Sequence, residues 1–138
     1  MQIAGIQKTT LLDYPGHLAA TIFTRGCNFA CPFCHNADLV VGEGAGTPCP
    51  PGLSQEELFA FLKKRRGILE GVCITGGEPT LWRDLPDVVK KIKEMGFLVK
   101  LDTNGSSPEM LKALCSGGYV DYVAMDVKAS LGNYKRVA

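Results

Sequence analysis

Three cysteines stand close together near the start of the chain, in the segment TRGCNFACPFCHN that covers residues 24–36. Cys27, Cys31 and Cys34 follow the spacing C-x3-C-x2-C. Thiolates are ligands of zinc and of iron–sulfur clusters, so this spacing predicts a metal centre in the loop. A disulfide framework of the six cysteines would suit a small secreted chain, but 46% of these residues are hydrophobic and can form an ordinary core.

The number of clustered cysteines favours an iron–sulfur cluster over zinc, although the spacing alone leaves both open. A structural zinc ion takes four ligands, commonly from two pairs. His35 could be the fourth, but it adjoins Cys34 and strains that geometry, and we give it no catalytic role. A [4Fe-4S] cluster with three thiolates keeps one iron open. Gly26 would permit close backbone approach, and Phe29 and Phe33 would shield the cluster from water.

The other three cysteines are isolated in the sequence. Cys73 falls in an expected strand and Cys115 on an expected helix, where a cysteine is usually a small buried hydrophobe. Cys49 lies in a Gly/Pro-rich stretch, residues 42–52, which we expect to be a loop. Its role as an additional ligand stays open beside that of a plain loop cysteine.

Strand and helix patterns alternate along the chain and predict an α/β fold with a mainly parallel sheet. Ser54 with Glu57 is a possible capping box, Asp84 a possible N-cap, and Gly67 and Gly96 are possible helix ends. One domain over residues 1–138 fits this length. The expected strands cover residues 18–23, 72–75, 97–101 and 119–127, and the expected helices cover residues 54–67, 84–96 and 107–118.

Unusual segments follow or end each expected strand. The cysteine loop follows the first, TGGEPT the second and DTNG the third, while MDVK ends the fourth. Right-handed crossovers bring the carboxyl ends of parallel strands to one edge of the sheet, where α/β proteins bind ligands. The sequence therefore predicts one site built from all four segments.

Bulk composition excludes several other classes of protein. The net charge of +1 argues against nucleic-acid binding, and the basic run KKRR at residues 63–66 suits the end of a helix. No apolar run approaches the length of a membrane span. The N-terminus lacks a signal-peptide core, so we expect a cytoplasmic protein with no membrane partner.

Taken together, these segments resemble the radical S-adenosylmethionine (SAM) superfamily, whose motif is C-x3-C-x2-C with an aromatic residue, here Phe33, before the third cysteine. The resemblance implies that SAM chelates the open iron and that reductive cleavage yields a 5′-deoxyadenosyl radical. It also implies that Gly76, Gly77 and Glu78 meet the methionine amino group. A carboxylate suits an ammonium group, and glycine permits close approach.

The resemblance extends to LDTNG and MDVK. In glycyl-radical-enzyme activating proteins, similar segments hold the SAM ribose and carboxylate, in some members through a monovalent cation. This implies that Asp102, Thr103, Asn104 and Asp126 bind the cofactor, and that Lys128 lies close to the reaction centre. Without the cysteine loop, the same residues would be read as a turn and a surface ion pair.

Residues 5–36 resemble the opening of anaerobic ribonucleoside-triphosphate reductase activating proteins. This implies that the chain generates a glycyl radical on a partner enzyme, most plainly anaerobic ribonucleotide reductase, with electrons from a flavodoxin- or ferredoxin-type donor. The family core is a partial (βα) barrel of roughly six units, of about 30 residues each. This chain supplies about four, so we expect a barrel that is short at the C-terminus.

Two alternatives stay open from the sequence. The first is a radical SAM enzyme acting on a small molecule, similar to 7-carboxy-7-deazaguanine synthase. The second is a non-catalytic module that binds an iron–sulfur cluster or zinc. A glycyl radical on a protein partner separates the first from the activating enzyme, and zinc without iron would indicate the second.

Overall fold

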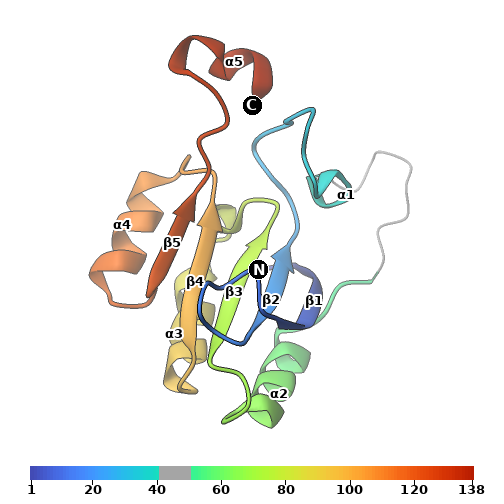
Figure 1. The fold of residues 1–138 in the computed structure, drawn as a ribbon, viewed down its shortest axis with the longest axis vertical. Coiled ribbons are helices and arrows are strands. Elements are labelled where there is room, and N and C mark those ends of the chain that lie inside the picture. The colour runs from blue at the N-terminus through green and yellow to red at the C-terminus, as the bar shows by residue number, and fades with distance from the viewer. Residues whose placement is uncertain (41–50) are drawn as a thin grey trace.

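A computed structural model describes residues 1–40 and 51–138 of the chain. The described residues form one five-stranded sheet in the order β1-β2-β3-β4-β5, with helices packed against it (Figure 1). The strands are β1 (Ile3–Thr10), β2 (Ala19–Thr24), β3 (Gly71–Gly76), β4 (Leu98–Thr103) and β5 (Tyr122–Met125). The α-helices are α1 (Ala37–Val40), α2 (Gln55–Arg65), α3 (Leu85–Glu94), α4 (Pro108–Ser116) and α5 (Tyr134–Val137).

The predicted α/β fold with a parallel sheet is confirmed, since β2, β3, β4 and β5 pair in parallel in chain order. All four strands run toward the same end of the molecule. Helix α5 and the segment that follows β2 lie at that end (Figure 1). The sequence reading missed β1, which pairs antiparallel with β2. Its residues IAGIQKTT are half exposed and lack a clear apolar alternation, so they carry a weak strand signal.

One face of the sheet forms the hydrophobic core with the helices. Alternate strand residues point into it, because side chains in a strand alternate between the two faces. The strand members are Ala20, Ile22, Val72, Ile74, Val99 and Leu101, and the helix members include Leu58, Leu62, Val88, Val89, Ile92 and Leu114. This packing fixes the register of the strands, so their carboxyl ends lie at a defined edge.

Several helix ends follow the predicted signals. Ser54 and Glu57 form a capping box at the start of α2, and Gly67 and Gly96 take positive φ angles of 76° and 91° just after α2 and α3. Asp84 occupies the N-cap position of α3 without capping it. Its carboxylate accepts instead from Gln55 Nε2 at 2.8 Å and from the N-terminal ammonium group.

Of the three isolated cysteines, Cys73 and Cys115 differ in their surroundings. Cys73 is fully buried, as expected. Cys115 is exposed, so its expected burial is wrong, because it lies on the outer face of α4 while Leu114 takes the core position. Cys49 and most of the expected loop 42–52 lie outside the described residues. None of the helices described here is long and apolar enough to cross a membrane.

Candidate radical SAM site

A cavity of about 200 Å³ opens at the carboxyl ends of β2–β5. It is lined by residues from all four segments that the sequence singled out. Every candidate site residue contributes to this lining: Cys27, Cys31, Phe33, Cys34, Gly76, Gly77, Glu78, Asp102, Thr103, Asn104, Asp126 and Lys128. The tertiary structure therefore brings together residues that are up to about a hundred positions apart in the sequence.

The cysteine loop begins where β2 ends and is held by backbone hydrogen bonds. Gly26 has a φ angle of +78°, which favours glycine, and its N–H donates to the carbonyl oxygen of Leu39 at 2.8 Å. Within the loop, the Cys34 N–H donates to the Cys31 carbonyl oxygen at 3.1 Å. These bonds hold the loop in place, and all three of its cysteines line the cavity.

Cys27 has the closest polar neighbours of the three thiols. Its Sγ accepts from the Phe29 N–H at 3.4 Å and from Asn104 Nδ2 at 3.8 Å. Burial raises the pKa of the Cys27 thiol, and the negative charge of Glu78 adds to the increase. The two N–H donors are placed to stabilise negative charge on this sulfur.

The three cysteines of the loop line the cavity together with His35. Among residues 1–40 and 51–138, no group of three or more His, Cys, Asp or Glu side chains is placed to hold a metal ion. Thiolates are ligands both of zinc and of iron–sulfur clusters, so the preference for a cluster rests on the number and spacing of the cysteines.

Gly76 and Gly77 let the end of β3 pass directly against the start of the cysteine loop. A Cβ on Gly76 would lie 2.3 Å from the Thr24 nitrogen, and one on Gly77 would lie 1.9 Å from the Gly26 carbonyl oxygen. Gly76 also has a φ angle of +117°. The sequence reading explained these glycines by approach to a ligand. The structure gives them a further reason, which is backbone contact between two strand ends.

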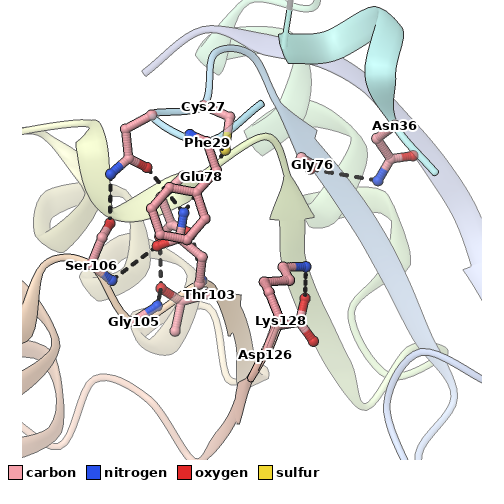
Figure 2. A network of polar contacts seen from close by, with 12 residues as sticks. Cys27, Phe29, Asn36, Gly76, Glu78, Thr103, Gly105, Ser106, Asp126 and Lys128 are labelled. Atoms are coloured by element: carbon pink, nitrogen blue, oxygen red, sulfur yellow. Dashed lines mark hydrogen bonds and ion pairs between the residues drawn. The ribbon is translucent and has the colours of Figure 1, made fainter. Parts of the chain in front are cut away.

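Glu78 is the most deeply buried carboxylate of the cavity, with a relative exposure of 1%. Its Oε1 accepts from the Thr80 N–H at 3.1 Å, from the Thr80 hydroxyl and from Thr103 Oγ1 at 2.7 Å. Its Oε2 accepts from the Asn104 N–H at 2.7 Å. Glu78 thus ties β3 to β4, and Oε2 keeps acceptor capacity for a ligand (Figure 2).

A second set of hydrogen bonds joins the cysteine loop to the end of β4. Asn104 Nδ2 donates to Asn28 Oδ1 at 3.0 Å, and Asn28 Nδ2 donates to Ser106 Oγ at 2.9 Å. The Ser106 N–H closes the ring by donating to Asn104 Oδ1 at 2.9 Å. Asn28 and Ser106 therefore hold the Asn104 side chain in place, and its Nδ2 also donates to Cys27 Sγ.

The two aspartates of the cavity each contact a lysine. Asp126 accepts from Lys128 Nζ at 2.6 Å, and Asp102 accepts from Lys100 Nζ. Burial lowers the pKa of Lys128, but the hydrogen bond and charge of Asp126 outweigh burial and leave that pKa raised. Lys128 is therefore an ammonium group at the mouth of the cavity. The Lys128 N–H also donates to Tyr134 Oη at 3.1 Å, which connects this turn to α5.

The two phenylalanines of the loop differ in their surroundings. Phe29 packs edge-on against Tyr134, with ring centroids 6.4 Å apart. Phe33 lines the cavity and is 54% exposed, and its expected role in shielding a cluster stays a prediction. Sequence reasoning gave no role to Asn36, whose Nδ2 lies 3.5 Å from the Gly76 carbonyl oxygen. It also gave no role to Lys100, although a charged residue inside the apolar run FLVKL was a visible signal.

Comparison with known proteins identifies the family. Residues 21–137 match the model of the radical SAM superfamily, and the chain therefore belongs to this superfamily. Membership implies a [4Fe-4S] cluster and SAM as cofactors. The fold is accordingly a partial-barrel-like radical SAM domain. It resembles the crystal structure of QueE from Escherichia coli with a TM-score of 0.62 and 24% identity, over 76% of this chain and 52% of that one.

Three relatives are similar to this chain over part of their length. A Methanocaldococcus jannaschii protein, assigned by name to the glycyl-radical enzyme activating enzymes, is 37% identical over 134 residues, which is 96% of this chain and 52% of that protein. A second protein so named from the same organism is 34% identical over 79% of this chain and 39% of its own length. A protein named as a GTP 3′,8-cyclase of Sulfolobus acidocaldarius is 43% identical over 59% of this chain and 25% of its own length. The chain spans about half the length of the first of these relatives, and less of the others.

Proposed function

We propose that this chain activates a glycyl-radical enzyme, using SAM and a [4Fe-4S] cluster. The observation that carries the proposal is the convergence of twelve candidate residues from four strand ends on one cavity. The names of two relatives support the same class of activity. The cluster and SAM, when bound, supply one-electron reductive cleavage of an S–C bond and hydrogen abstraction.

The three thiols of the loop have the role of cluster ligands in this proposal. Cys27, Cys31 and Cys34 would each ligate an iron of the cluster, and the remaining iron would be open to SAM. Asn104 and the Phe29 backbone N–H donate to Cys27 Sγ, and hydrogen bonds to sulfur stabilise the added negative charge of a reduced cluster.

The charges of the cavity suit the methionine end of SAM. Glu78, Asp102 and Asp126 are its carboxylates, and the last two are paired with lysines. Glu78 accepts only from hydroxyl and backbone N–H groups among the described residues, so its charge is left for a ligand cation. We assign the methionine ammonium to Oε2 of Glu78, because charge-assisted hydrogen bonds are the strong ones.

The ends of β4 and β5 have the role of holding the remaining polar groups of SAM. Asp102, Asn104 and Asp126 face the cavity and offer oxygen and amide groups to the ribose and carboxylate. Thr103 is 4% exposed and its hydroxyl donates to Glu78, so it acts by orienting that carboxylate. Lys128 is the ammonium group nearest the reacting centre in this assignment.

The partner and the electron donor complete the proposal. We assign anaerobic ribonucleotide reductase as the glycyl-radical enzyme, on the resemblance of residues 5–36 to its activating proteins. A flavodoxin- or ferredoxin-type protein would supply the electron. The similarity to a protein named as a GTP cyclase favours, as the second candidate, a radical SAM enzyme acting on a small molecule.

An anaerobic spectroscopic experiment tests the proposal. The protein is reconstituted with iron and sulfide and reduced, and EPR spectra are recorded with and without SAM, while 5′-deoxyadenosine is assayed. We expect a cluster signal that shifts with SAM, and a glycyl-radical signal when anaerobic ribonucleotide reductase is added. Deoxyadenosine without a protein radical would favour the small-molecule enzyme. Zinc without iron would contradict the cluster assignment.

Cys31→Ala and Cys115→Ser make a matched pair for this experiment. Cys31 lines the cavity, whereas Cys115 is exposed on α4. We expect Cys31→Ala to abolish SAM cleavage and Cys115→Ser to leave it unchanged. Cleavage that survives in purified Cys31→Ala would remove Cys31 from the ligand set.

A further inference from the structure

A row of polar residues crosses the sheet on the face opposite the helical core. Thr21, Cys73, Lys100 and Tyr122 are cross-strand neighbours in β2, β3, β4 and β5. Lys100 is only 7% exposed, and Cys73 is fully buried. A buried ammonium group is costly unless its charge is compensated, so Lys100 requires a specific partner.

The Lys100 ammonium contacts two members of this row and one further residue of its own strand, β4. Its Nζ donates to Asp102 Oδ1, lies 3.7 Å from Cys73 Sγ and lies 5.9 Å from the centre of the Tyr122 ring. Two of these neighbours, Asp102 and Cys73, accept hydrogen bonds from the ammonium group, and the Tyr122 ring adds a cation–π contact.

The partner carboxylate, Asp102, lies between Lys100 and the cavity. Its Oδ2 accepts from the Cys73 thiol at 3.4 Å, and the residue lines the cavity. Burial lowers the pKa of Lys100, but the hydrogen bond to Asp102 and the negative charge of that carboxylate outweigh burial and leave that pKa raised. The pair is thus an ion pair, in which the positive charge lies beneath the floor of the cavity.

We propose that Lys100 is the built-in cation of this site and the residue that positions Asp102. Its charge neutralises Asp102 from the side away from the cavity, so the site needs no metal cation beside that carboxylate. A carboxylate offers about four acceptor positions, and two are used by Lys100 and Cys73. The remaining two bind neutral donors such as sugar hydroxyls. The identity of that ligand, SAM, rests on the proposed function.

SAM binding in different salts tests the proposal on the unmodified protein. The full chain with its cluster is dialysed anaerobically against SAM in sodium, potassium or choline chloride at equal ionic strength. We expect the dissociation constants to agree within about twofold. A gain of about tenfold or more in sodium or potassium over choline would show that the site uses a metal cation, and would overturn the proposal.

Variants of Lys100, measured in the same three salts, provide a second test. Lys100→Met leaves the Asp102 charge uncompensated, so we expect sodium or potassium to raise the melting temperature and SAM affinity over choline. Lys100→Arg keeps a cation beside Asp102, so its melting temperature and SAM affinity should be the same in all three salts. The double variant Lys100→Met with Asp102→Asn removes both charges, so its melting temperature should no longer rise in sodium or potassium. A Lys100→Met protein that melts alike in all three salts would contradict the role of Lys100.

Lys93→Met is the matched control for this test. Lys93 Nζ also pairs with an aspartate, Asp121, at 2.7 and 2.8 Å, but neither residue lines the cavity. We expect Lys93→Met to show no cation-specific response. If the cluster-loaded protein binds no SAM in any salt, the proposed function is contradicted. The melting temperatures of Lys100→Met in the three salts would still decide the role of Lys100. If Lys100→Met does not fold, the salt series on the unmodified protein decides it.

Discussion

Gly77 lies against Gly26 so closely that a Cβ on Gly77 would be 1.9 Å from the Gly26 carbonyl oxygen. Two hydrogen bonds hold the backbones at this separation. The Gly77 N–H donates to the Thr24 carbonyl oxygen at 2.9 Å, and the Glu78 N–H donates to that of Gly26 at 2.7 Å. The turn after β3 is therefore the direct backbone support of the cysteine loop.

Replacing Gly77 should damage this support. Gly77→Ala forces the two backbones apart, and overpacking of this kind costs about 1–3 kcal/mol. We expect a lower free energy of unfolding in denaturant and a lower iron content after reconstitution. Gly5→Ala is the control, because a Cβ on Gly5 meets nothing within 4 Å. Full iron loading in Gly77→Ala would show that the loop does not depend on this contact.

Glu78→Gln should lose both stability and SAM affinity. Glutamine has one acceptor oxygen, and its NH₂ group would face N–H and O–H donors that now point at Glu78. A buried donor left unsatisfied costs about 1–3 kcal/mol. Denaturant unfolding and SAM dialysis measure the two effects separately. Glu56→Gln, on the exposed first turn of α2, should change neither. Unaltered SAM affinity in a folded Glu78→Gln protein would contradict the assignment of the ammonium partner.

Asn104→Ala should lower the reduction potential of the cluster. The Asn104 amide donates to Cys27 Sγ at 3.8 Å, and loss of a donor destabilises the more negative reduced state. Anaerobic redox titration followed by EPR measures the shift. Asn133→Ala is the control, since Asn133 Nδ2 donates to Ser130 Oγ at 3.1 Å and Asn133 does not line the cavity. An unchanged potential in Asn104→Ala would show that this contact does not tune the cluster.

Cys73 should resist alkylation over a wide pH range. Burial and the negative charge of Asp102 raise the pKa of its thiol to about 12, so it stays protonated as pH rises from 7 to 9. The thiolate is the reactive form, and Cys73 is also inaccessible. We expect iodoacetamide to modify exposed Cys115 and spare Cys73, read by peptide mass spectrometry of the cluster-loaded protein. Labelling of Cys73 in the folded protein would mean that the sheet opens at β3.

The alternation of strands and helices was predictable because it depends on local patterns. Apolar periodicity, the Ser54–Glu57 capping box and the glycines after α2 and α3 are short-range signals, and the structure confirms them. Strand β1 was not predictable in the same way. It is stabilised by antiparallel pairing with β2, and that pairing is a tertiary contact between half-exposed residues.

The sequence was enough to predict that the segments after β2, β3, β4 and β5 form one site, because parallel strands with right-handed crossovers bring their carboxyl ends to one edge. It did not predict that Asn36 and Thr75 also line the cavity, nor how the site residues contact one another, which depends on the folded sheet. Glu78 joins β3 to β4, Gly77 supports the cysteine loop, and Asp102 contacts a buried Lys100. These relationships depend on which side chains face one another across neighbouring strands. Register sets those contacts, and packing of the whole sheet against its helices sets the register.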